Sequence, residues 1–165
     1  MSDSFQPGDR VYIETTVVSY LTARPSRDLI VAAHQQITHD WWGTCRTNYE
    51  LCVSELVLDE AGAGDAQAAR ERLLVLQPML VIETTTAAFE LAEDLLRAGA
   101  LPRKAASDAL HIAVAATKAI PYLLTWNCRH LANAAMRPVI EAVCAAKELK
   151  APIICTPEEL MESMP

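Results

Sequence analysis

The segment RVYIETTVVSYL, residues 10–21, decides the fold. Its first four residues predict a short β-strand, Arg10–Ile13, because Val, Tyr and Ile favour extended backbone. Glu14 follows the strand, and the two threonines after it are residues that commonly begin a helix. We therefore expect a strand that leads through a single acid into a helical turn or two over Val17–Thr22.

The same order of a short apolar strand followed by a helix recurs along the chain. Four more strands are predicted, at Leu51–Val53, Met79–Ile82, Tyr122–Thr125 and Ile153–Cys155. The segments between them carry apolar residues at helical spacing. Alternation of short strands with helices predicts an α/β fold, in which a parallel sheet is covered by helices on both faces.

Length and composition indicate one compact domain. The chain has 165 residues, of which 52% are hydrophobic and 21% charged, and this is a globular composition with a substantial core. We expect residues 1–9 to form a loose lead-in and residues 10–165 to form a single domain. The N-terminus lacks the basic and apolar regions of a signal peptide, and the longest apolar stretch, near Leu73–Ile82, is too short to span a bilayer. These features predict a cytoplasmic protein with no membrane contact.

Charge and motifs exclude several classes of function. The formal net charge of −7 argues against a protein that holds nucleic acid on a large basic surface. It does not exclude a nuclease, because bound divalent cations reverse the local sign of the potential. The five cysteines show no C-x-x-C spacing, and the chain has no dinucleotide-binding, P-loop or nucleophile-elbow motif. Zinc, nucleotide and serine-hydrolase chemistry are therefore disfavoured.

Four polar residues that follow or sit on these elements are the candidate site: Glu14, Glu60, Asp108 and Asn127. In parallel sheets ligands bind beyond the carboxyl ends of the strands. Glu14 comes just after the first strand and Asn127 just after the fourth, so both are expected on the same rim. Carboxylates gathered without a cation repel one another, so such a cluster indicates Mg²⁺ or Mn²⁺.

Each of these residues also has a structural interpretation. Asp108 lies near the start of an apolar helix, where a carboxylate caps the helix or complements its dipole as readily as it binds a metal. Glu60 shares its helix with Glu55 and Asp59, and the pattern alone does not choose among the three acids. Glu14 is equally typical of a solvated loop acid, and Asn127 is more typical of a turn or a helix cap than of a ligand.

Four further polar residues lie close to the candidate site in sequence. The hydroxyl of Thr125 is placed to hold a carboxylate or a water, and Ser54 is placed to cap the helix that carries Glu60. His111 lies one turn after Asp108 in an apolar helix, where a lone histidine is more often a packing residue than a ligand. His130 is expected in an exposed loop.

Taken together, these segments resemble the PIN-domain family, and in particular its VapC-like ribonuclease toxins. The resemblance rests on four segments in the family's order, namely VYIETTVVSYL (11–21), VSELVLDE (53–60), ASDALHIAVA (106–115) and LLTWNCRHLAN (123–133). It implies a three-layer α/β/α sandwich with a central, mainly parallel sheet, and an acidic pocket that binds Mg²⁺ or Mn²⁺. It also implies endoribonuclease activity on RNA, an antitoxin protein as partner, and a homodimer.

The resemblance assigns roles by position. Glu14, Glu60 and Asp108 match the family's first three acids, which hold the metal, and Asn127 falls at a fourth catalytic position where the family often has an acid. The first acid is usually Asp, so Glu14 is longer by one methylene. The expected reaction is hydrolysis of RNA by a metal-activated water. The alternatives are a non-catalytic PIN-fold module that binds nucleic acid or protein, with Asn127 marking a degraded site, and a structural homodimer whose acidic rim has no function.

Overall fold

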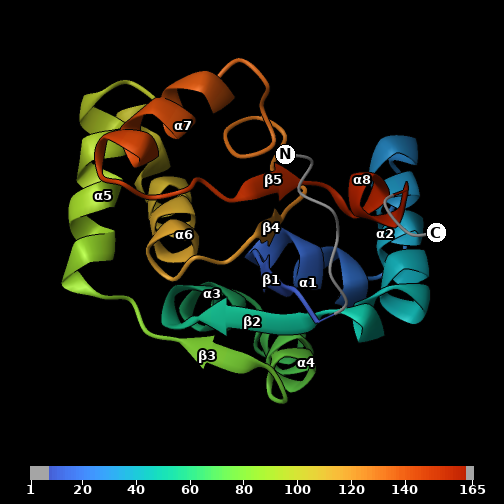
Figure 1. The fold of residues 1–165 in the computed structure, drawn as a ribbon. Helices are drawn as coiled ribbons and strands as arrows, with labels where there is room; N and C mark the ends of the chain where they lie inside the picture. The colour runs from blue at the N-terminus through green and yellow to red at the C-terminus, as the bar shows by residue number, and fades with distance from the viewer. Residues whose placement is uncertain (1–7, 163–165) are drawn as a thin grey trace.

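Five parallel strands form one central sheet in the computed structural model, which describes residues 8–162 (Figure 1). The strands are β1 (Arg10–Ile13), β2 (Glu50–Ser54), β3 (Leu80–Ile82), β4 (Tyr122–Leu124) and β5 (Ile153–Cys155). Their order across the sheet is β3-β2-β1-β4-β5. The predicted parallel sheet is therefore confirmed, and each predicted strand boundary lies within one residue of the observed one.

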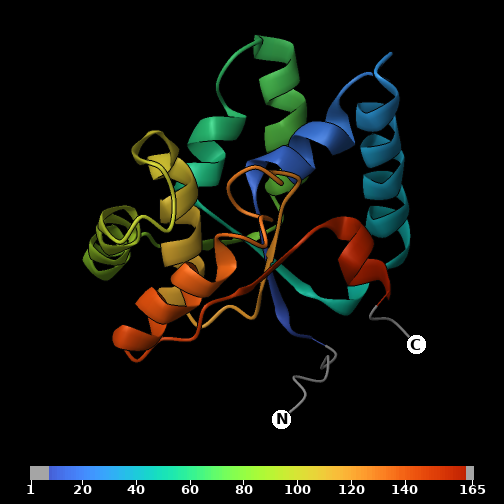
Figure 2. The ribbon, with the colours of Figure 1, turned by 90° about the horizontal axis from the view of Figure 1, so that it is seen from above.

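Helices cover both faces of this sheet, which confirms the α/β/α sandwich. The helices are α1 (Thr15–Thr22), α2 (Leu29–Thr44), α3 (Glu55–Ala61), α4 (Ala66–Leu76), α5 (Thr86–Arg97), α6 (Ala106–Thr117), α7 (Arg137–Ala146) and α8 (Pro157–Glu162), with 3₁₀ turns at Arg46–Asn48 and Arg103–Ala105. The helices α5, α6 and α7 pack together on one side, whereas α1, α2 and α8 lie on the other (Figure 2). The helices α3 and α4 pack beside α1.

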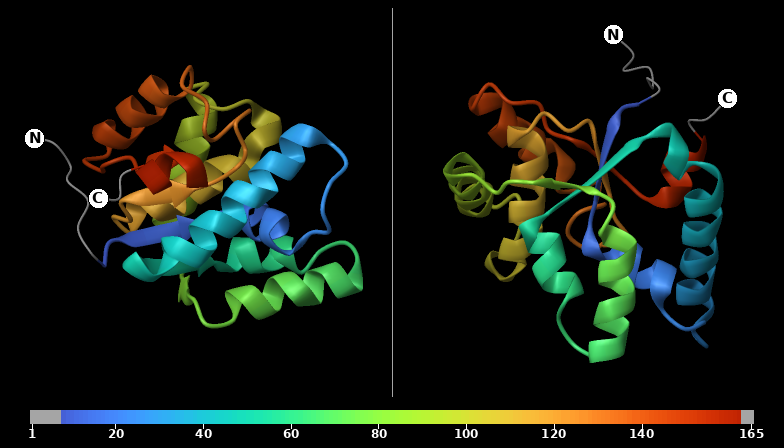
Figure 3. Two further views of the ribbon diagram at one scale, coloured as in Figure 1. Left: turned by 90° about the vertical axis from the view of Figure 1, so that its right-hand side faces the viewer. Right: turned by 90° about the horizontal axis from the view of Figure 1, so that it is seen from below.

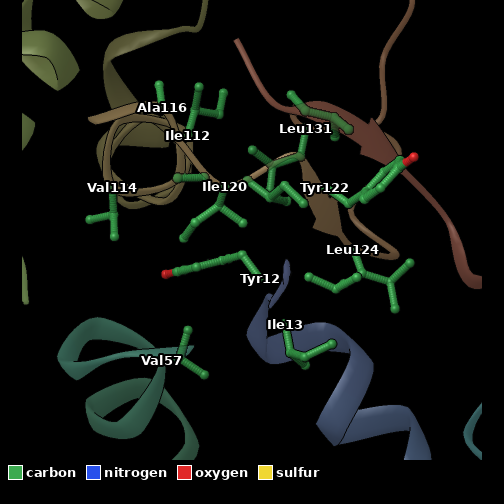
Figure 4. Packing of buried hydrophobic residues seen from close by; sticks show 14 of the residues in the cluster. Tyr12, Ile13, Val57, Ile112, Val114, Ala116, Ile120, Tyr122, Leu124 and Leu131 are labelled. Atoms are coloured by element: carbon green, nitrogen blue, oxygen red, sulfur yellow. The ribbon is translucent and has the colours of Figure 1, made fainter. Parts of the chain in front are cut away.

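The central strand β1 is the middle of the core. Val11, Tyr12 and Ile13 are completely buried, because β1 pairs with β2 on one side and β4 on the other and is covered on both faces. The predicted burial of the apolar helix is also confirmed, since the residues from Ile112 to Ala116 in α6 are buried. Figure 4 shows Tyr12 of β1 lying close to residues of α6 and the turn after it.

A side-chain cap is present at the start of one helix and absent at the start of another. Asp28 caps α2 with its side chain, which accepts hydrogen bonds from the backbone N–H groups of Ile30 and Val31. The prediction that Ser54 caps α3 is wrong, because that helix has no side-chain cap. The Ser54 hydroxyl is completely buried and bonds to Tyr12 instead.

Two expectations concern the chain as a whole. The predicted lead-in over residues 1–9 falls mostly outside the described residues, and the single domain over residues 10–165 stays a prediction. Within residues 8–162, no helix combines the length and the apolar character that a membrane crossing requires.

Candidate metal centre

The candidate site lies at the carboxyl ends of β1 and β4, the two strands at which the strand order reverses direction. Ile13 of β1 pairs with Leu124 of β4, so the residues that follow them, Glu14 and Thr125, stand side by side. The loop after β4 lies over this edge of the sheet and beside α1 (Figures 2 and 3). Parallel sheets bind ligands at such reversal points, and the prediction that Glu14 and Asn127 share one rim is confirmed.

Glu14 is an almost fully buried carboxylate, with 3% of its surface exposed. Its Oε2 accepts hydrogen bonds from the hydroxyls of Thr16 and of Thr125, the latter at 2.7 Å. Burial raises the pKa of Glu14 above its ordinary value, and the nearby His111 and the two threonine hydroxyls offset only part of that rise. The expectation that Thr125 holds a carboxylate is confirmed.

Glu60 comes from the last turn of α3 and has a different environment. Its Oε1 accepts hydrogen bonds from Ser107 Oγ at 2.6 Å and from His111 Nε2 at 2.9 Å. Burial disfavours the charged form of Glu60, but the interactions with His111 and the bond from Ser107 outweigh burial and lower its pKa to about 2. Glu60 is therefore ionised at neutral pH. Its two neighbours Glu55 and Asp59 are exposed.

Asp108 stands in the first turn of α6 and faces the loop after β4. Its Oδ1 accepts a hydrogen bond from Asn127 Nδ2 at 3.1 Å, and its Oδ2 is 3.0 Å from His130 Nδ1. Asn127 Oδ1 in turn accepts the backbone N–H of His130 at 3.1 Å. The two loop residues therefore hold both carboxylate oxygens of Asp108. The expectation of an exposed His130 is wrong, because its side chain is only 16% exposed and contacts Asp108.

The tightest group of ligand atoms is not the one that the sequence predicts. Glu14, Glu60 and His111 each place one ligand atom within 4.8 Å of the others. The structure thus brings Glu14 and Glu60 together, but Asp108 stays outside this group. A chain of hydrogen bonds joins the two parts, because the backbone N–H of Asn127 donates to Thr125 Oγ1 at 2.9 Å and Thr125 donates to Glu14.

The residues present fit a divalent cation. Two carboxylates at close range repel each other, and burial raises the pKa of Glu14, so a bound cation would favour the charged form of both. Carboxylate oxygens are the donors that Mg²⁺ and Mn²⁺ prefer. The buried hydroxyl of Thr15, the residue after Glu14, lies at Glu60 and helps to lower the pKa of that carboxyl.

Sequence reasoning missed three contributors to this site: Thr16, Ser107 and His111. Each lies within three residues of a predicted acid, and that proximity was the available signal. His111 is indeed a buried residue, as the packing interpretation expected. Its polar contacts were not visible, because they join it to residues from two other elements.

Comparison with known proteins agrees with the fold and with the family resemblance. A family model of the PIN domain matches residues 11–135. Among solved structures, the chain is similar to a chain in the crystal structure of VapBC2 from Rickettsia felis bound to a DNA fragment from their promoter. The two chains share 13% sequence identity and superpose with a TM-score of 0.58, and the match covers 89% of this chain and 98% of the other. At this identity the likeness shows the fold alone. A search of curated proteins gave no match. The family match spans most of the chain and confirms the resemblance, so this protein belongs to the PIN-domain family.

Proposed function

We propose that the protein is a metal-dependent endoribonuclease that hydrolyses phosphodiester bonds of RNA, and that it acts as the toxin of a toxin–antitoxin pair. The observation that carries this proposal is the meeting of Glu14 and Glu60 within a PIN fold, at the sheet edge where ligands bind. Asp108 and Asn127 lie in the same hydrogen-bonded network.

In this proposal Glu14, Glu60 and Asp108 hold Mg²⁺ or Mn²⁺. When bound, the ion lowers the pKa of a coordinated water and neutralises charge on the phosphate that is cleaved. Glu60 is already ionised at neutral pH and provides a preformed negative charge. Asn127 adds no charge, and its amide orients Asp108 from the loop after β4. Three carboxylates and one amide form a set of side chains suited to one tightly bound ion.

The proposed partners follow from the family and from the structural neighbour. The substrate is RNA, and the similarity to VapBC2 supports an antitoxin protein as the regulator of this chain. We also propose a homodimer and a cytoplasmic location. With a net charge of −7, contact with RNA would be local and would depend on the bound cation rather than on a wide basic surface.

The test is cleavage of a mixed panel of structured and single-stranded RNAs in Mg²⁺, in Mn²⁺ and in EDTA. Wild type is compared with Asp108→Asn, and Asp59→Asn serves as the matched control because Asp59 is an exposed acid beside the site. We expect cleavage that requires metal, is abolished in Asp108→Asn and is unchanged in Asp59→Asn. Full activity of a folded Asp108→Asn protein would remove Asp108 from the mechanism.

A second candidate function is a non-catalytic PIN-fold module that binds nucleic acid or protein. It is favoured by one observation, namely that both oxygens of Asp108 are already engaged by Asn127 and His130. This alternative predicts that wild type neither binds Mn²⁺ in calorimetry nor cleaves any RNA of the panel. Metal binding accompanied by cleavage would exclude it.

A further inference from the structure

We propose that a buried chain of three residues, Ser54, Tyr12 and His111, positions the carboxylate of Glu60 for the cation. We call this chain the relay. In this inference His111 is a positioning residue and not a metal ligand. The inference rests on the proposed metal binding, and it concerns how the protein prepares one particular ligand.

The three residues of the relay come from three different elements of the core, and Glu60 lies on a fourth. Ser54 Oγ at the end of β2 lies 2.7 Å from the hydroxyl of Tyr12 in β1. The same hydroxyl lies 2.7 Å from Nδ1 of His111 in α6, and Nε2 of His111 lies 2.9 Å from Oε1 of Glu60 in α3. Ser54, Tyr12 and His111 are all completely buried. A buried polar chain of this kind is favourable only when each group is satisfied.

The carboxylate at the end of the chain fixes the direction of the bonds. Ser107 and His111 both approach Oε1 of Glu60, and a carboxylate oxygen accepts, so Nε2 of His111 donates. In this arrangement Nδ1 of His111 accepts, and the Tyr12 hydroxyl donates to it. The Tyr12 oxygen in turn accepts the hydroxyl of Ser54. Each donor in the chain therefore has one acceptor, and the last acceptor is the Glu60 carboxylate.

The relay also selects which oxygen of Glu60 is available. His111 and Ser107 both donate to Oε1, and these two bonds fix the rotation of the carboxylate about its last side-chain bond. They leave Oε2 as the oxygen that the relay does not use. Partners that orient a metal-binding carboxylate in this way typically change metal affinity or activity about 10–100-fold when they are removed.

The same contacts argue against His111 as a ligand. Both of its ring nitrogens are already engaged, Nδ1 by Tyr12 and Nε2 by Glu60. Ligation through Nε2 would break the bond to Glu60 and move the proton to Nδ1. The hydroxyls of Tyr12 and Ser54 would then both have to reverse. The edge-on packing of the Tyr12 and His111 rings, with centroids 5.7 Å apart, further fixes the imidazole.

The test measures metal binding by calorimetry without RNA, so it does not depend on catalysis. Tyr12→Phe removes only the hydroxyl in the middle of the relay, and we expect about 10–100-fold weaker binding of both Mn²⁺ and Mg²⁺. His111→Leu should weaken the binding of both ions by at least the same factor. His111→Gln should restore part of the affinity, because an amide N–H can replace Nε2. Tyr20→Phe is the matched control, since Tyr20 lies on α1 and packs against His34 and Trp126 rather than on the relay.

Several outcomes decide the inference. Unchanged affinity in folded Tyr12→Phe and His111→Leu would overturn the relay, even if wild type binds metal and cleaves RNA. A selective loss of Mn²⁺ over Mg²⁺ in His111→Gln would also overturn it, because imidazole ligation favours the transition metal. If Tyr12→Phe does not fold, Ser54→Ala tests the other end of the relay. We expect a smaller loss of affinity for both ions in this variant, and unchanged affinity would refute the relay. A wild type that binds metal but cleaves no RNA would contradict the proposed nuclease and leave the relay to be judged by these affinities.

Discussion

The surroundings of Glu14 and Glu60 differ sharply, although their carboxylates meet in one cluster. Glu14 is almost completely buried and receives its hydrogen bonds from two neutral threonine hydroxyls, and burial raises its pKa. The side chain of Glu60 is 31% exposed, and its pKa is lowered to about 2. One carboxylate is therefore a preformed anion, whereas ionisation of the other is costly until positive charge arrives. Glu14 is therefore the carboxylate whose ionisation depends most on a bound cation.

The largest expected effect is the stabilisation of the folded protein by metal. A ligand that binds only the native state at 100 times its dissociation constant adds about 2.7 kcal/mol to the free energy of unfolding. We expect Mn²⁺ to stabilise wild type on this scale and to give almost no stabilisation in Glu14→Gln, because that variant removes the charge that most needs the ion. Urea denaturation with and without Mn²⁺ measures both values. Equal stabilisation of Glu14→Gln and wild type would show that Glu14 is not a ligand.

A second effect of comparable size, with opposite signs at the two glutamates, is expected in metal-free protein at neutral pH. Glu60→Gln should lower the free energy of unfolding by about 1.5–3 kcal/mol, since it loses hydrogen bonds to a charged acceptor. Glu14→Gln should raise it, because the amide keeps an acceptor for Thr16 and Thr125 but carries no buried charge. Such a gain in stability at the expense of function is common at active sites. The measurement is denaturation of both variants after removal of metal. A change of the same sign in the free energy of unfolding of both variants would contradict the proposed difference between the two glutamates.

The sequence predicts where these two glutamates lie in the fold but not how their surroundings differ. The strands could be predicted closely, since short apolar runs followed by polar residues leave few alternatives for β1 and β4. The rim positions of Glu14 and Asn127 followed from the parallel sheet, because neighbouring parallel strands end at the same edge. The hydrogen bond from Thr125 to Glu14 followed from the same geometry, since the two residues continue paired strands.

The electrostatic character of each acid could not be predicted, because it depends on contacts between distant segments. His111 meets Glu60 across 51 residues and Tyr12 across 99, and no periodicity reports such a meeting. For the same reason Ser54 was assigned to a helix cap that its buried hydroxyl does not make. The exclusion of Asp108 from the tight group depends on the loop after β4, which holds both of its oxygens.

The smallest expected effect is a difference in how stability depends on pH, again in metal-free protein. The folded pKa of Glu60, about 2, lies below its ordinary value of 4.5, so its stabilisation is fully present above pH 4.5 and is lost as the pH falls toward 2. The folded pKa of Glu14 lies above 4.5, so the stability it contributes is present below pH 4.5 and is lost as the pH rises through its raised value. Glu60→Gln should therefore flatten the rise of stability on the acid side, and Glu14→Gln should flatten the fall above pH 4.5. Urea midpoints measured between about pH 2 and pH 7 distinguish a change on the acid side from a change above pH 4.5. If both variants changed the stability over the same pH range, the two carboxylates would titrate as one coupled pair. The proposed difference between their environments would then be wrong.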